Sequence, residues 1–150
     1  VLTELNRLFQ MDQQAGHFFT IWYGVYQPST RALRYSGAGH PPAIVLSADG
    51  ADPTQLPSGS IPVGVLGNST FETHSYLLPP DTDLLLYSDG AFELDLRDGR
   101  AWSLEDFIGL CARTAATPGW TLDDLIAKIR DRSISGVFDD DCTLVRVTVR

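Results

Sequence analysis

Two apolar runs, each joined to an acidic turn, constrain most strongly how this chain can fold. The first run, Leu84 to Tyr87, ends in the turn Ser88-Asp89-Gly90, and the second, Thr143 to Val149, follows the triplet Asp139-Asp140-Asp141. Short apolar runs next to turn residues are typical of buried β-strands. We therefore expect carboxylates at the ends of two strands that lie far apart in the sequence.

Carboxylates held at strand ends can bind a hard divalent cation, because Mg²⁺ and Mn²⁺ prefer oxygen ligands. A pair of such ions is a common means of hydrolysing phosphate esters. The alternative interpretation is structural, since an Asp-Gly pair is an ordinary turn and an acidic run can be a solvated loop. From the residues alone, both interpretations stay open.

Size and charge exclude several classes of function. The chain has 150 residues, which suits one domain, and its net charge is −8, which repels a phosphate backbone and argues against nucleic-acid binding. No apolar run of about 20 residues, as a membrane helix requires, occurs in these 150 residues, and no signal peptide is visible in them. Two isolated cysteines, Cys111 and Cys142, fit a reduced cytoplasmic protein with buried thiols, and no zinc-type spacing is present.

Periodicity predicts the remaining elements. The expected helices span residues 1–9, 103–114 and 121–132, and the expected strands span 18–26, 32–36, 43–46, 71–78, 84–87 and 143–149. Residues 47–60 are expected to form a loop, and Asp98-Gly99 a turn. Capping boxes beginning at Ser103 and Thr121 mark two of the helix starts. Because strands and helices are segregated along the chain, we predict an α+β fold with antiparallel sheets.

Five short motifs occur in a fixed order along nearly the whole chain. They are Val1-Leu2-Thr3-Glu4-Leu5-Asn6, the run from Tyr35 through Ala38-Gly39-His40 to Pro42, Ile61-Pro62-Val63-Gly64-Val65, the run from Leu84 through Ser88-Asp89-Gly90 to Glu93, and Asp140-Asp141-Cys142-Thr143-Leu144. Together they resemble the SpoIIE-type bacterial branch of the protein phosphatase 2C (PPM) family.

The resemblance implies a β-sandwich of mostly antiparallel sheets flanked by helices. It also implies a cytoplasmic signalling enzyme that hydrolyses phosphoserine or phosphothreonine in proteins, with two Mn²⁺ or Mg²⁺ ions in the complete domain. In this branch the substrate is commonly a phosphorylated STAS-domain anti-anti-sigma factor of a partner-switching pathway. The reaction uses a metal-activated water, and the remaining catalytic groups are expected in a segment before Val1.

The resemblance also assigns roles to individual residues. Asp89 and Asp140 match metal-binding aspartates of the family, and Gly90 completes the first turn. Asp141 is expected beside the site, and which residue of the acidic triplet faces the metal stays open by one position. His40 matches a position near an accessory metal in eukaryotic relatives, but we interpret it as a turn histidine bonded to the backbone.

The family's first acidic blocks, which complete the metal pair, have no counterpart in these 150 residues. We therefore expect a single partial domain that lacks its N-terminal strands and has little activity alone. Missing strands would expose sheet edges, which predicts self-association or a homodimer. The first alternative is a non-catalytic phosphatase-like module that binds a STAS or anti-sigma partner. The second, outside the family, is a small α+β ligand-binding domain.

Overall fold

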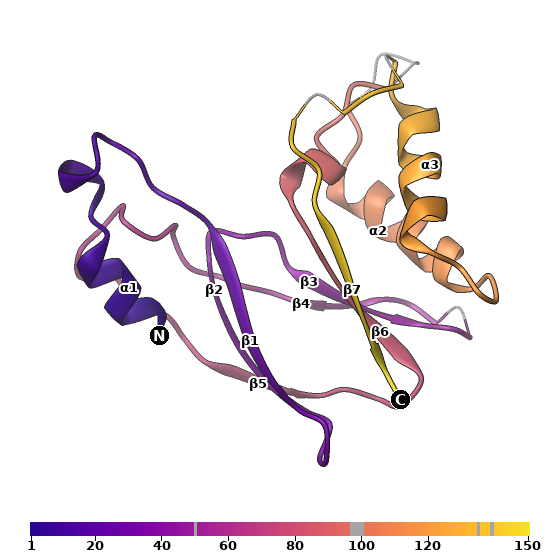
Figure 1. Cartoon of the computed structure of the whole chain (residues 1–150), viewed down its shortest axis with the longest axis horizontal. Helices are drawn as coiled ribbons and strands as arrows, with labels where there is room; N and C mark the ends of the chain where they lie inside the picture. Colours follow the sequence, from indigo (N-terminus) through magenta and orange to yellow (C-terminus); the bar gives the residue numbers. More distant parts are fainter. Residues whose placement is uncertain (50, 97–100, 135, 139) are drawn as a thin grey trace. The chain divides into compact units, whose positions relative to one another are not determined.

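The computed structural model describes residues 1–49, 51–96, 101–134, 136–138 and 140–150 (Figure 1). In these residues it has three α-helices and two antiparallel β-sheets, which confirms the expected fold class. The helices are α1 (Leu2–Leu8), α2 (Leu104–Ala115) and α3 (Leu122–Arg132). The strands are β1 (Ile21–Gln27), β2 (Ala32–Ala38), β3 (Ala43–Ser47), β4 (Thr54–Leu56), β5 (His74–Leu77), β6 (Thr82–Tyr87) and β7 (Leu144–Val149). Short 3₁₀ turns are η1 (Met11–Gln13) and η2 (Asp89–Ala91).

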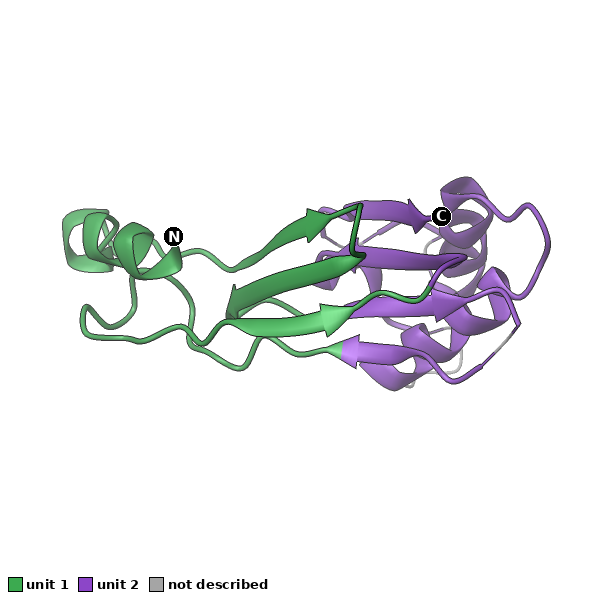
Figure 2. Ribbon diagram, turned by 90° about the horizontal axis from the view of Figure 1, so that it is seen from below, with its two compact units in different colours: residues 1–42, 56–79 green, residues 43–55, 80–150 purple. Residues whose placement is uncertain are grey.

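The chain divides into two compact units (Figure 2). The first, residues 1–42 and 56–79, contains a three-stranded sheet in the order β1-β2-β5. Its small core consists of Leu2, Ala38 and Val63, with Phe9 and Phe19 among the side chains packed against it. The buried Asn6 joins α1 to a loop, because its side chain donates to the Leu66 carbonyl at 2.8 Å and accepts from the Gly64 amide at 2.8 Å.

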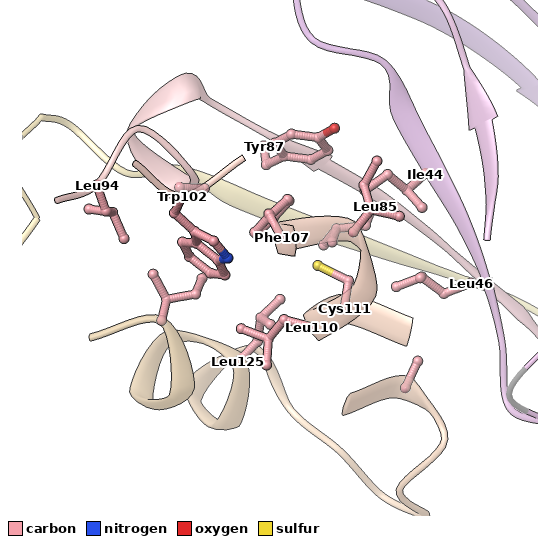
Figure 3. Packing of buried hydrophobic residues seen from close by; sticks show 14 of the residues in the cluster. Ile44, Leu46, Leu85, Tyr87, Leu94, Trp102, Phe107, Leu110, Cys111 and Leu125 are labelled. Atoms are coloured by element: carbon pink, nitrogen blue, oxygen red, sulfur yellow. The ribbon is translucent and has the colours of Figure 1, made fainter. Parts of the chain in front are cut away.

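The second unit, residues 43–55 and 80–150, contains most of the four-stranded sheet, whose order is β4-β3-β6-β7. Strand β6 lies between β3 and β7, with Leu85 opposite both Ile44 and Arg146. Side chains of β3 and β6 form one hydrophobic cluster with α2 and α3 (Figure 3). Phe107 of α2 lies near its centre, 4.6 Å from the ring of Tyr87.

Both predicted capping boxes are present. The Ser103 hydroxyl accepts from the Asp106 amide at 3.1 Å, and the Thr121 hydroxyl accepts from the Asp124 amide at 3.2 Å. In each box the aspartate side chain accepts from the backbone amide of the capping residue in return. Local sequence is sufficient to specify these helix starts, because all the groups lie within four consecutive residues.

Some boundaries differ from the expectations. Strand β4 lies inside the expected loop 47–60, and its hydrogen-bonded neighbour is β3. Three residues are too few to show a strand periodicity in the sequence. These residues are extended because they pair with β3. Strand β1 begins at Ile21, three residues later than expected. The expected turn Asp98-Gly99 lies outside the described residues. No described helix combines the length and apolar character needed to cross a membrane.

Candidate metal centre

Asp89 lies directly after the end of the central strand β6. Ser88 is still extended, and the chain then closes into the 3₁₀ turn η2, in which the amides of Phe92 and Glu93 both donate to the Asp89 carbonyl at 2.9 Å. One carboxylate oxygen of Asp89 accepts from the Gly90 amide at 3.1 Å. The Asp89 side chain is exposed, while Gly90 is buried beneath it. The carboxylate is therefore held by its own turn and open to solvent.

Asp140 lies on the approach to the edge strand β7. One of its carboxylate oxygens accepts from the Asp141 amide at 2.7 Å, and both aspartates are exposed. Asp139, the first member of the acidic triplet, lies outside the described residues. Asp140 thus has the same local arrangement as Asp89, with one backbone bond to the next residue and an open face.

The hydroxyl of Ser88 joins these two segments, which are more than fifty residues apart in the sequence. It donates to the Asp141 carbonyl at 2.8 Å and accepts from the Thr143 amide at 2.9 Å. The Ser88 amide also donates to the Thr143 carbonyl at 3.0 Å, beyond the last paired residues of β6 and β7. Three hydrogen bonds therefore hold the turn after β6 against the segment before β7.

Gly90 packs directly against the acidic segment. A Cβ atom at this position would lie 2.6 Å from the Asp141 carbonyl oxygen and 3.1 Å from that of Asp140. Gly90 serves this close approach and not an unusual backbone angle, since it is not among the residues with positive φ. Only glycine leaves room for the two backbones to meet here. The turn after β6 and the acidic segment before β7 thus lie against each other.

The charges at this junction are uncompensated. Among the described residues, Asp89, Asp140 and Asp141 have no lysine, arginine or histidine within ion-pair distance. A divalent cation bound at these carboxylates would offset their unpaired negative charge. The donors are oxygens on fixed turns, which suits Mg²⁺ or Mn²⁺. Across the described ranges, no group of three or more His, Cys, Asp or Glu side chains is placed to hold a metal ion, so these residues offer a partial ligand set.

Other side chains considered from the sequence have structural roles. A ring nitrogen of His40 lies 3.0 Å from the Pro41 carbonyl, which confirms the interpretation of a turn histidine bonded to the backbone. Trp102 and Trp120 are buried in the core of the second unit. Cys142 packs against that core, and burial raises the pKa of its thiol, as expected for a small apolar side chain rather than a reactive one.

A polar cluster near the start of β6 was not predicted from the sequence. Asp83, only 8% exposed, pairs with the Arg146 guanidinium at 2.8 Å and accepts from the Thr148 hydroxyl at 2.7 Å. Arg146 also lies over the Trp120 ring, 3.9 Å from its centroid, and donates to the Trp120 carbonyl at 2.6 Å. The sequence feature that could have indicated this cluster is Arg146, a charged residue within the apolar run Thr143 to Val149. Its partner depends on the register of β6 and β7, which local sequence does not specify.

The fold is that of protein phosphatase 2C domains. The family model described as Stage II sporulation protein E (SpoIIE) matches residues 1–150, so the chain belongs to the SpoIIE family, as its motifs predicted. It is similar to the phosphoserine phosphatase RsbP of Bacillus subtilis, with 34% identity over 62% of this chain. It is also similar to a crystal structure of the RsbU and RsbW domains of Rv1364c from Mycobacterium tuberculosis, with 26% identity over 94% of this chain and a TM-score of 0.70.

A third similarity concerns the fold alone. The phosphatase domain of SpoIIE from Bacillus subtilis, in a manganese-presoaked structure, covers 87% of this chain at 20% identity with a TM-score of 0.62. The present chain spans 24% of RsbP, 38% of the Rv1364c chain and 56% of the SpoIIE chain. The matches therefore establish family and fold, while the metal-binding roles of Asp89, Gly90 and Asp140 stay predictions.

Proposed function

We propose that this chain provides part of the metal centre of a divalent-metal-dependent protein phosphatase acting on phosphoserine or phosphothreonine. The observation that supports it most directly is the junction of the two acidic turns through Ser88 and Gly90 in a chain of the SpoIIE family. Asp89 and Asp140 hold the metal ions through their carboxylates. Gly90 allows the two turns to approach, and its backbone belongs to the same site.

The residues of the chain contribute mainly by positioning. Bound Mn²⁺ or Mg²⁺ supplies positive charge that lowers the pKa of a water molecule and offsets charge on the phosphoryl oxygens. The Ser88 hydroxyl fixes the distance between the two turns with bonds of 2.8 and 2.9 Å. The backbone amides of Gly90 and Asp141 each bond one carboxylate oxygen, which restrains the rotation of Asp89 and Asp140. Such restraint reduces the ordering cost when a cation binds.

Two carboxylates do not satisfy a hydrated divalent ion well, because Mg²⁺ requires six oxygen ligands in near-ideal geometry. We therefore infer that full affinity and turnover require further acidic ligands in addition to Asp89 and Asp140. The 150-residue chain by itself is then a weak metal binder with little phosphatase activity.

The proposed substrate is a phosphorylated protein. Relatives include phosphoserine phosphatases, and a STAS-domain anti-anti-sigma factor is the substrate class that the SpoIIE resemblance implies. The alternative is a non-catalytic module that binds a STAS or anti-sigma partner. It is favoured by the incomplete ligand set among the described residues.

Manganese binding to the purified chain tests the metal site. We expect titration calorimetry to show weak Mn²⁺ binding that falls about tenfold or more in Asp89→Asn and in Asp140→Asn, since each substitution removes one charged ligand. Asp12→Asn, an exposed aspartate in η1, is the matched control and should bind like the wild type. Equal Mn²⁺ affinity in all four proteins would refute the assignment.

Turnover tests the enzymatic part of the proposal. The same variants are assayed with Mn²⁺ on a phosphoserine peptide. Each is tested both as the 150-residue chain and within a longer polypeptide that also contains the family's first acidic blocks. We expect activity only in the longer protein and its loss in Asp89→Asn. Metal binding without turnover in the longer protein would favour the non-catalytic module.

We also propose that the chain self-associates through an open sheet edge. Strand β7 is at one end of the four-stranded sheet, and Val145 and Val147 on it are 47% and 39% exposed. Unpaired edges with apolar side chains favour pairing with another chain. Sedimentation velocity should show dimers or larger species at high concentration. A monodisperse monomer under those conditions would contradict this.

A further inference from the structure

Helices α2 and α3 pack against each other in the second unit (Figure 1). A basic groove lies between them. It is open to solvent, has a volume of about 440 Å³ and is lined by Leu110, Arg113, Thr114, Lys128, Asp131 and Arg132. Three of these six side chains are cationic and one is acidic. The whole chain has 11 basic and 19 acidic residues, so the groove opposes the overall charge balance.

Two of the three cations, Lys128 and Arg132, are held in position by neighbouring groups. Lys128 donates to the hydroxyl of the fully buried Thr114 at 3.2 Å. The Arg132 guanidinium lies over the buried Trp102 ring, 5.7 Å from its centroid. The Arg113 guanidinium folds back over Gly109, where it would lie 3.1 Å from an added Cβ. Positions fixed in advance reduce the entropy that is lost when an anion binds.

These cations are not neutralised by ion pairs. Within the part of the chain that the structure describes, Arg113, Lys128 and Arg132 have no carboxylate within 4.0 Å. Arg7 and Arg146, in contrast, pair with Glu4 at 2.6 Å and Asp83 at 2.8 Å. Apart from the electrostatic interaction of Lys128 with Asp124, one helical turn earlier on α3, the charges of the groove are available to an external anion.

Helix stability explains only part of this arrangement. Arg113 and Arg132 lie in the last turns of their helices, where cations interact favourably with the helix dipole. Lys128 lies a full turn before the end of α3 and still points to Thr114 on the other helix. The dipole does not account for a third cation in the same groove.

We propose that this groove binds an acidic polypeptide segment in an extended conformation. Lys128 and Arg132 are one helical turn apart, about 6 Å along the axis. Carboxylates at alternate positions of an extended peptide are about 6.6 Å apart, which matches that spacing. Arg113 faces the same peptide from α2.

Fluorescence anisotropy with a labelled, alternating glutamate–alanine heptapeptide tests this surface, using the full 150-residue chain at low ionic strength. We expect Lys128→Gln and Arg132→Gln each to weaken binding about two- to fivefold, as for partly exposed ion pairs. Arg130→Gln is the matched control, because Arg130 lies on α3 over Phe138 and does not line the groove. Its binding should equal that of the wild type.

A second variant separates binding from folding. Asp131 lines the groove and repels the peptide, so Asp131→Asn should tighten binding by about two- to fivefold. A gain of affinity does not arise from misfolding. Weaker or unchanged binding in Asp131→Asn would overturn the proposal.

Two competitors test the nature of the ligand. One competitor is a heptapeptide with four contiguous glutamates. It has the same charge as an alternating heptapeptide that begins and ends with glutamate, but its carboxylates do not have the proposed spacing, and we expect it to bind several-fold more weakly. Inorganic phosphate at the peptide's own concentration should not displace the peptide. Equal binding of both peptides, displacement by phosphate, or no peptide binding at low salt would each overturn the assignment of an extended acidic segment.

Discussion

The two ends of β6 place aspartates in opposite surroundings. Asp83, near the start of the strand, is buried and paired with Arg146, with a further bond from Thr148. Asp89, just after its end, is exposed and has no cationic neighbour among the described residues. The same residue type on one strand therefore contributes to stability at one end and offers unpaired charge at the other.

The difference shows which carboxylates are available for chemistry. A carboxylate that is already paired gains little from a metal ion, because its charge is offset and its oxygens are bonded. A carboxylate without a cationic neighbour keeps its charge and its oxygens available to a metal ion. A substitution of Asp83 should therefore lower stability and leave metal binding unchanged. A substitution of Asp89 should lower metal binding and leave stability nearly unchanged.

The largest effect is expected at the paired end. Asp83→Ala leaves the Arg146 guanidinium, a quarter exposed, without its partner and should lower the free energy of unfolding by about 3 kcal/mol. Chemical denaturation measures it. The Mn²⁺ affinity of the folded protein should be unchanged, and a loss of affinity would break the proposed separation between the two ends.

Gly90→Ala should affect stability and metal binding together. The added methyl would meet the Asp141 carbonyl oxygen at 2.6 Å, so the two turns must move apart. We expect a loss of about 1–3 kcal/mol in the free energy of unfolding, as for other overpacked sites. Gly59→Ala, where a Cβ meets nothing within 4 Å, is the control. Equal stability of both variants would contradict the close approach.

At the unpaired end, Asp89→Asn and Asp140→Asn should change the free energy of unfolding by less than about 0.5 kcal/mol in the absence of metal. Each substitution removes a charge that has no cationic neighbour among the described residues and retains an oxygen that accepts the backbone bond. Thermal unfolding in a chelator measures this. A strong destabilisation would show that these aspartates serve the fold instead of a metal.

The smallest effect concerns a carboxylate that is satisfied by hydrogen bonds alone. Bonds from the Thr121 hydroxyl and amide lower the pKa of Asp124. Because the pKa is lower in the folded state, the stabilisation is present above the unfolded pKa and is lost as the pH falls below about 4. The wild type should therefore have a higher melting temperature than Asp124→Asn at pH 7, and the gap should close near pH 2.5. A gap that is the same at both values would contradict this.

Local elements of the fold were predictable from the sequence. The capping residues Ser103 and Thr121 and the strand leading to Asp89 depend on a few consecutive residues, and all were found as expected. Strand β4 and the Asp83–Arg146 ion pair were not predicted from the sequence, because each depends on a partner in another segment of the chain. The position of Gly90 in the turn after β6 was predicted. Its close contact with the backbone of Asp141 was not, because that contact joins two distant segments.

The sequence by itself determined the helices, most strands, the excess of negative charge and the order of the SpoIIE motifs, because these follow from side-chain chemistry and spacing along the chain. Only the tertiary structure decided which charges meet. The pairing of β6 with β7 brings Ser88 and Gly90 against Asp141 and places Asp83 beside Arg146, whereas the packing of α2 on α3 gathers Arg113 with Lys128. Strand register and helix packing depend on contacts between distant segments, and electrostatic interactions follow the resulting distances.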